Sequence, residues 1–349
     1  MIDKKTIYFY GNWKTQSGYI GEPQRTLQAL IDNYKKKGIA AEVLDRIDKI
    51  EKTEKHSIKI LIFGDFTTIL IRAILCFLSG IIFSNIRIIV FKNKATFRDI
   101  FFFLKNINSF NKIKYIIGFS LIEIFLPQNL YNYLLKIFKK KIFIVFFPTH
   151  IVERSKIFLC RCLEKKYAQN ILFQKDKKFY KNKITLVYFG QDSYLRGVDT
   201  INELNGHYKG YNIFSTGFFP FKGYLGKKGF GLQNLMFYND KNVLEKVKKA
   251  TFSIFPFRTK HGGPDVPAAL IESFFLGVPP IISKVLLFDV LRNHNYPLVI
   301  DTISSESIKK CIEENIRNGK DYEKIMSICF SIRQEIIDKY SYNFPKSYA

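Results

Sequence analysis

Acidic residues are scarce in this sequence of 349 residues. Asp and Glu number 30 against 55 Lys and Arg, which gives a formal net charge of +25 at pH 7. Such an excess favours an anionic partner, namely nucleic acid, an acidic lipid surface or a phosphorylated substrate. The basic residues are spread along the whole chain and accompany no recognisable nucleic-acid motif, so nucleic acid is not the expected partner.

Cysteine is also too sparse and too closely spaced for a zinc knuckle. The chain has five cysteines, and Cys160 and Cys162, separated by one residue, are followed by no second pair. This spacing does not match the usual ligand spacings of structural zinc sites. We therefore predict reduced thiols, as in a cytoplasmic protein.

Long apolar segments are lacking as well. Phe66–Ile86 is about the length of a membrane span, but it carries Arg72, and its charge-free part Ala73–Ile86 is shorter than the roughly 18 residues of a spanning helix. The N-terminal residues lack the long apolar core of a signal peptide. We expect a buried helix at 66–86, with a transmembrane helix as the less favoured alternative, and a cytoplasmic protein.

What the sequence does contain is alternation of strand and helix patterns over a length that favours two domains. Residues 5–13 predict a buried strand, residues 22–38 a helix with Pro23 in its first turn, and residues 39–45 the next strand. Further strands are predicted at 58–65, 86–91, 115–119, 142–147, 183–190, 211–217, 234–239, 251–257, 279–283 and 297–301. Helices are predicted at 67–80, 197–208, 240–250, 305–318 and 321–340.

This order predicts an α/β fold of two Rossmann-like domains facing a cleft. The expected boundaries are residues 1–165 for the first domain and 166–330 for the second. The stretch Lys165–Lys183, rich in Lys, Gln and Asn, is interpreted as the linker. Residues 331–349 are expected to pack back toward the first domain.

One loop in the second half has the features of an anion site. The predicted strand 251–257 is followed by "RTKHGGPDVP", in which Gly262 and Gly263 allow the backbone to approach a ligand closely. Pro267 suits the first turn of a helix, whose unpaired N–H groups attract anions. Arg258 and Lys260 add positive charge just before it.

A single acid, Glu272, lies in the apolar helix that follows, which ends at Gly277. It is near enough to the start of the helix to bind a sugar hydroxyl. A ligand that carries both a phosphate for the loop and hydroxyls for Glu272 would fit, which suggests a nucleotide sugar. The alternative is that Glu272 is a solvated helix residue and the glycines form an ordinary turn.

The stretch "IESFFLGVPPI", which begins at Ile271, resembles the donor-binding segment of glycosyltransferase family 4, retaining enzymes of the GT-B type with two Rossmann-like domains. That family has two glutamates eight positions apart, and Glu272 matches the second, which the resemblance implies binds the donor ribose. Pro264 stands where the first glutamate is expected, and Asp265, one residue on, is the candidate to replace it near the reaction centre.

A second stretch, "LVYFGQDSYLRGVDTINEL", resembles the start of the family's second domain. Arg196 and Gly197 match a Lys-Gly pair, which implies that Arg196 neutralises the donor diphosphate. Gln191 replaces an arginine, so Arg258 or Lys260 would supply the second charge. The alternative for Arg196 is a surface residue, although a cation is unfavourable at a helix start.

The opening of the chain resembles the family more weakly, with Gly18 and Gly21 expected at the cleft or, equally, in a structural turn. His150 follows a predicted strand and is the candidate for a histidine near the transferred sugar, its alternative being a loop histidine with local hydrogen bonds. The sequence contains no Asp-x-Asp, and the resemblance implies retaining chemistry without a metal or other cofactor, so cations and helix N–H groups would stabilise the leaving diphosphate.

The expected partners are a nucleotide-sugar donor and a glycan or lipid-linked acceptor, as in surface-polysaccharide synthesis. Apolar and basic stretches of the first domain are compatible with peripheral contact with an anionic membrane on its inner face, and the favoured alternative is that they are ordinary amphipathic helices. Three alternatives stay open: a nucleotide-sugar enzyme such as an epimerase, an inactive nucleotide-sugar-binding subunit, and a nucleic-acid binder.

Overall fold

The computed structural model describes a little over half of the chain, in two compact units that meet in sequence between Glu164 and Lys165. The described residues are 6–10, 22–44, 59–64, 72, 74–81, 86–90, 142–144, 157–158, 165–175, 177–191, 196–207, 212–218, 243–258 and 266–341. The described elements up to residue 158 belong to unit 1, and those from Lys165 to Ser341 belong to unit 2.

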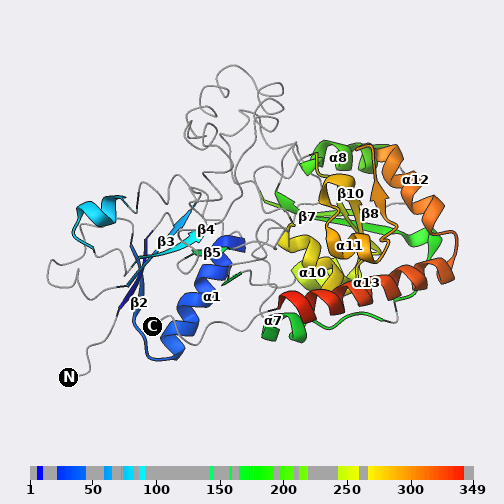
Figure 1. The fold of residues 1–349 in the computed structure, drawn as a ribbon. Helices are drawn as coiled ribbons and strands as arrows, with labels where there is room; N and C mark the ends of the chain where they lie inside the picture. Colours follow the sequence, from blue (N-terminus) through cyan, green and yellow to red (C-terminus); the bar gives the residue numbers. More distant parts are fainter. Residues whose placement is uncertain are drawn as a thin grey trace, which may run out of the picture. The chain divides into compact units, whose positions relative to one another are not determined.

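Unit 1 contains a parallel sheet with the strand order β2-β1-β3-β4-β5-β6 (Figure 1). The strands are β1 (Ile7–Tyr10), β2 (Ala41–Leu44), β3 (Lys59–Gly64), β4 (Ile86–Val90), β5 (Ile142–Ile144) and β6 (Ile157–Phe158). Helix α1 (Glu22–Lys36) connects β1 to β2 and buries Leu30, Ile31 and Tyr34. The predicted strand at 115–119 lies outside the described residues.

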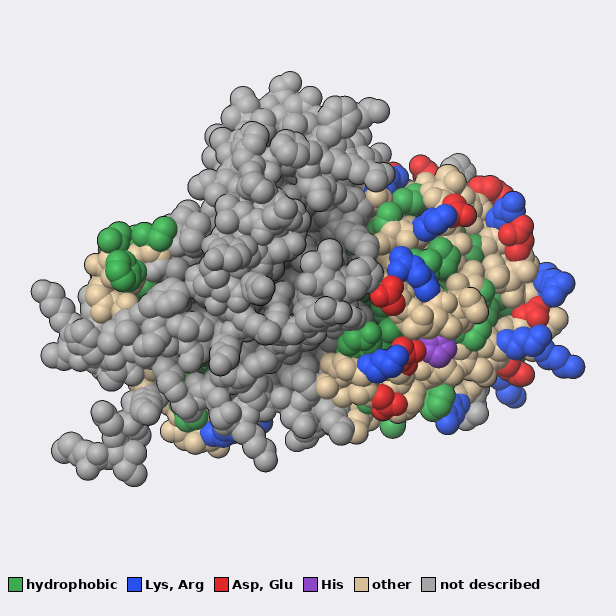
Figure 2. Space-filling model, in the orientation of Figure 1, with side chains coloured by type: hydrophobic (Ala, Val, Ile, Leu, Met, Phe, Trp, Pro, Cys, Tyr) green, Lys and Arg blue, Asp and Glu red, His purple; other side chains and the backbone are tan. Residues whose placement is uncertain are grey.

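A short helical stretch at residues 74–78 turns an apolar face outward. Cys76 is fully buried, whereas large apolar side chains on the other face are exposed: Ile74, Leu75, Phe77 and Leu78. Figure 2 shows hydrophobic side chains gathered there on the surface of unit 1. This stretch lies in the helix expected at 67–80, but the expectation that this helix is buried is wrong for residues 74, 75, 77 and 78. Within the described part of the chain, no helix is both long and apolar enough to span a membrane.

Unit 2 contains a second parallel sheet, with the order β11-β10-β9-β7-β8. Its strands are β7 (Thr185–Gln191), β8 (Asn212–Phe218), β9 (Phe252–Phe255), β10 (Pro280–Ser283) and β11 (Val299–Ile300). The three strands at the centre bury mostly apolar side chains, with Ser253 and Ser283 as buried polar exceptions, which is typical of parallel strands covered on both faces. The strand predicted at 234–239 lies outside the described residues.

Helices cover both faces of this sheet (Figure 1). They are α7 (Lys165–Asn170), α8 (Val198–His207), α9 (Val243–Lys249), α10 (Ala268–Leu276), α11 (Asp289–Asn293), α12 (Ser305–Asn315) and α13 (Gly319–Tyr340). Helices α8 and α12 contact one another, and α10 contacts both α9 and α13. This arrangement is the doubly wound one that the alternation of patterns predicts.

The interpretation of Lys165–Lys183 as a linker is wrong. Its first six residues form α7, which packs against α13, and Ala168 is fully buried there. Arg333 of α13 donates hydrogen bonds to the carbonyls of Ala168 and Ile171, at the end of α7. Of the C-terminal segment expected at 331–349, residues 331–340 form the end of α13 and residues 342–349 lie outside the described residues.

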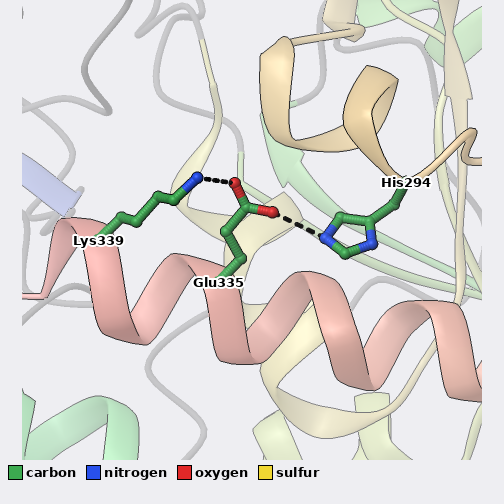
Figure 3. A network of polar contacts seen from close by, with 3 residues as sticks. All are labelled: His294, Glu335 and Lys339. Atoms are coloured by element: carbon green, nitrogen blue, oxygen red, sulfur yellow. Dashed lines mark hydrogen bonds and ion pairs between the residues drawn. The ribbon is translucent and has the colours of Figure 1, made fainter.

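A polar network joins α11 to α13 (Figure 3). The Nε2 atom of His294 lies 2.7 Å from Oε2 of Glu335, and Nζ of Lys339 donates to the other carboxylate oxygen at 2.6 Å. These bonds hold the pKa of Glu335 below its usual value, chiefly through the hydrogen bond from Lys339. The network therefore fixes the end of α11 against the long last helix.

Candidate functional site

The strand order of unit 2 contains a point where the chain changes direction across the sheet. β7 and β9 are neighbours, but β7 continues through α8 to β8 on one side, whereas β9 continues through α10 to β10 on the other. Ligands of open α/β sheets bind outside the carboxyl ends of the strands at such a point. Arg196 and Gly197 follow β7, and Arg258 follows β9, so three of the predicted donor-site residues flank this position.

Gly197 brings the two segments into backbone contact. Its φ is +70°, and a Cβ atom added there would lie 2.1 Å from the carbonyl oxygen of Pro256. No other residue type fits both the left-handed conformation and this close approach without displacing the backbone. The glycine that the sequence places after Arg196 is therefore required by the packing of the β7 and β9 segments.

Arg196 lies over an aromatic ring from the segment that follows β9. Its guanidinium carbon is 4.6 Å from the centroid of Phe257, and that ring is 4% exposed. A cation in this position is stabilised by about 0.5–2 kcal/mol, which offsets the unfavourable dipole at the start of α8. The carbonyl of Phe257 also accepts a 2.7 Å hydrogen bond from Oγ of Ser283, at the end of β10.

Arg258 forms a two-pronged ion pair with Asp199 in the first turn of α8. Its Nη1 and Nη2 atoms donate to the two carboxylate oxygens at 2.6 and 2.7 Å, and the two side chains are 15% and 27% exposed. From the sequence we expected Arg258 to provide charge to a ligand, and Asp199 was not among the predicted site residues. The only hint in the sequence was that Asp199 lies in the first turn of a predicted helix. Acidic residues are favourable there in any helix because of the helix dipole, so this position did not point to Arg258 as the partner.

Helix α10 forms where the sequence predicts it. The carbonyl of Pro267 accepts the first hydrogen bonds of the helix. The helix ends at Gly277, whose φ is +72°. The N–H groups of Gly277 and Val278 bond back to the carbonyls of Phe274 and Ser273, which is the usual glycine-terminated helix end. Glu272 lies in the second turn and is 1% exposed, so it is not the solvated helix residue of the alternative interpretation.

The remaining predicted site residues lie outside the described residues. These are Gly18, Gly21, His150, Lys260, Gly262, Gly263 and Asp265. Their assignments, and the ribose-binding role of Glu272, stay predictions. In the described ranges, no cluster of three His, Cys, Asp or Glu side chains is arranged as a metal site. Cys76, Cys311 and Cys329 are buried free thiols.

No family model matches the chain, and no curated protein matches it in sequence. Solved structures do match. Sucrose-phosphate synthase from Thermosynechococcus elongatus aligns over 95% of each chain, with 9% identity and a TM-score of 0.55. The N-terminal domain of trehalose-6-phosphate phosphatase from Candida albicans aligns over 96% of this chain and 94% of its own, with 11% identity and a TM-score of 0.50.

At this level of identity the likeness shows the fold. The chain has an α/β fold of the GT-B type, with two Rossmann-like parallel sheets, and this prediction is confirmed. The resemblance to glycosyltransferase family 4 remains a resemblance of short sequence segments.

Proposed function

We propose that this protein is a glycosyltransferase that moves a sugar from a nucleotide-sugar donor to an acceptor hydroxyl. The observation that carries the proposal is Arg196, held over Phe257 beside the start of α8, at the direction change between β7 and β9. The shared fold with sucrose-phosphate synthase adds to it.

The chemistry requires a diphosphate to leave as an anion. Arg196 and the N–H groups of the first turn of α8 are suited to stabilise that charge where it develops. In the proposed site Lys260, Gly262 and Gly263 complete the phosphate contacts, and Glu272 binds the ribose. The roles predicted for Asp265 and His150 at the transferred sugar belong to the same proposal. The transfer retains the anomeric configuration and uses no metal.

The test is protein-dependent hydrolysis of UDP-, GDP- and ADP-sugars, measured as released nucleoside diphosphate. The expected result is slow release with one donor class, lost in Arg196→Gln and Glu272→Gln, while Lys310→Gln on the outer face of α12 keeps it. Binding of a donor without release, by the wild-type protein, would favour the alternative of an inactive nucleotide-sugar-binding subunit. If the protein neither binds a donor nor releases nucleoside diphosphate, both the transferase and the binding-subunit proposals are contradicted.

The proposed acceptor is a glycan or a lipid-linked glycan in surface-polysaccharide synthesis, bound by unit 1 at the inner face of the membrane. The exposed apolar face at residues 74–78 supports this, because large exposed apolar patches mark interaction sites. Co-sedimentation with vesicles containing anionic lipid should fall in the Phe77→Ser, Leu78→Ser double variant. Unchanged co-sedimentation would remove this face from the proposal.

A further inference from the structure

Three consecutive residues after β9 touch the residues just before α8 and the first turn of that helix. Pro256 lies against Gly197, Phe257 lies under Arg196, and Arg258 pairs with Asp199. Each contact is of a different kind: a backbone approach, a cation over a ring, and an ion pair. Together they fix the position of one segment relative to the other.

The ion pair also determines what Arg258 can do for an anionic ligand. Two of the five N–H donors of its guanidinium, one on each terminal nitrogen, already bond to Asp199 in the strongest geometry that an arginine and a carboxylate adopt, so this edge of the guanidinium is occupied. A phosphate that took these two nitrogens would leave the Asp199 carboxylate, 27% exposed, without this partner. Removing one member of a partly buried ion pair is unfavourable, so the exchange of one anion for another gains little.

We propose that the Asp199–Arg258 pair is a positioning device of the donor diphosphate site, and that Arg258 is not itself a phosphate ligand. The pair holds residues 256–258 so that the ring of Phe257 lies under Arg196, and Arg196 is thereby presented to the diphosphate. Asp199 acts through Arg258 and Phe257 and touches no substrate atom. This inference rests on the proposed function, because it assigns roles within that site.

The two roles of Arg258 predict opposite effects of Asp199→Asn. If Arg258 bound phosphate directly, loss of the carboxylate would remove a competing anion and tighten nucleoside diphosphate binding. If the pair positions Phe257, the same change loosens residues 256–258 and weakens the ring contact of Arg196. The expected weakening is about 2- to 30-fold, the range that corresponds to loss of a cation–ring contact.

The experiment is titration calorimetry of UDP, GDP and ADP with the wild-type protein and its variants. We expect Asp199→Asn and Arg258→Gln to weaken nucleotide binding by similar factors. The double variant should bind with about the same affinity as the single variant that binds less tightly, because both changes break the same pair. Phe257→Leu, which changes no charge, should reproduce the effect. Lys310→Gln with Glu314→Gln, an exposed ion pair of α12, is the matched control and should bind like the wild type.

Salt dependence separates positioning from direct contact. Arg196→Gln should reduce the slope of log Kd against log salt, whereas Arg258→Gln should leave the slope as in the wild type. Equal or tighter binding by Asp199→Asn, or a reduced slope in Arg258→Gln, would overturn the inference and leave the proposed function intact. Absence of nucleotide binding by the wild-type protein would overturn both. If Asp199→Asn does not fold, the nucleotide affinity of Phe257→Leu and the salt dependence of binding by Arg258→Gln test the inference instead.

Discussion

Replacement of Gly197 by alanine tests the closest contact at the proposed donor site. An alanine at φ +70° costs about 1–2 kcal/mol for the left-handed conformation alone. Its methyl carbon would lie 2.1 Å from the carbonyl oxygen of Pro256, whereas close C···O contacts are normally about 3.3 Å or longer. The overlap of more than an ångström has to be relieved by moving the segment at Pro256.

That movement would disturb the two neighbouring contacts, of Arg196 with Phe257 and of Arg258 with Asp199. Their loss adds about 2–3 kcal/mol, so we expect a total destabilisation of about 3–5 kcal/mol. For a domain of this size the melting temperature should fall by about 6–20 °C. Nucleoside diphosphate binding should weaken as well, because Arg196 adjoins the substituted position.

Two other glycines provide matched controls for thermal and urea unfolding of Gly197→Ala. Gly38 has a φ of +74° with nothing within 4 Å of the added Cβ, so Gly38→Ala should lose only about 1 kcal/mol. Gly277, in the same unit as Gly197, has a φ of +72° and a nearest atom at 3.1 Å, so its alanine variant should fall between the two. If Gly197→Ala is as mild as Gly38→Ala, the carbonyl of Pro256 does not restrict the side chain at position 197.

Three further predictions concern the supports of the same unit. Ser283→Ala removes the buried hydrogen bond to the carbonyl of Phe257 and should lower the unfolding free energy by about 1–2 kcal/mol; an unchanged urea midpoint would contradict it. The pKa of Glu335 is lowered in the folded protein, chiefly by Lys339, so its stabilisation is present above about pH 4.5 and lost as the pH falls below that value. Glu335→Gln should therefore be less stable at pH 7, with a difference that shrinks in acid thermal melts; a constant difference would count against the network. Burial lowers the pKa of Lys177 from 10.5 to about 7, so its contribution to stability should rise with pH across that interval. Urea unfolding at pH 7 and pH 9.5 should show that Lys177→Met removes this rise, and an unaltered pH dependence would show that the ammonium is not desolvated.

Most of the described strands and helices were predictable because their sequence patterns are strong. The strands of unit 2 have mostly apolar sequences with a glycine or proline nearby, and α10 is bounded by Pro267 and Gly277. Helix α7 was missed because lysine, glutamine and asparagine dominate it. It is held by a small number of contacts, among them buried Ala168 and the hydrogen bonds from Arg333, a residue far along the chain.

The donor-binding roles of the site residues stay predictions, and the structure bears only on which of these residues lie close together. Arg196, Gly197 and Arg258 were named from the sequence, and the structure brings the segments that carry them together. The partner of Arg258 was not found because Asp199 lies 59 residues away. Their meeting depends on β7 and β9 being neighbours, and the order of strands in a sheet leaves no local pattern in the sequence.

A crystal structure of the protein with the nucleoside diphosphate that it binds most tightly would test the proposed donor site most directly. We expect the two phosphates beyond the carboxyl ends of β7 and β9, in contact with Arg196, while Arg258 keeps its pairing with Asp199. Phosphates bound away from that edge of the sheet, or bound to Arg258 with the ion pair broken, would contradict it.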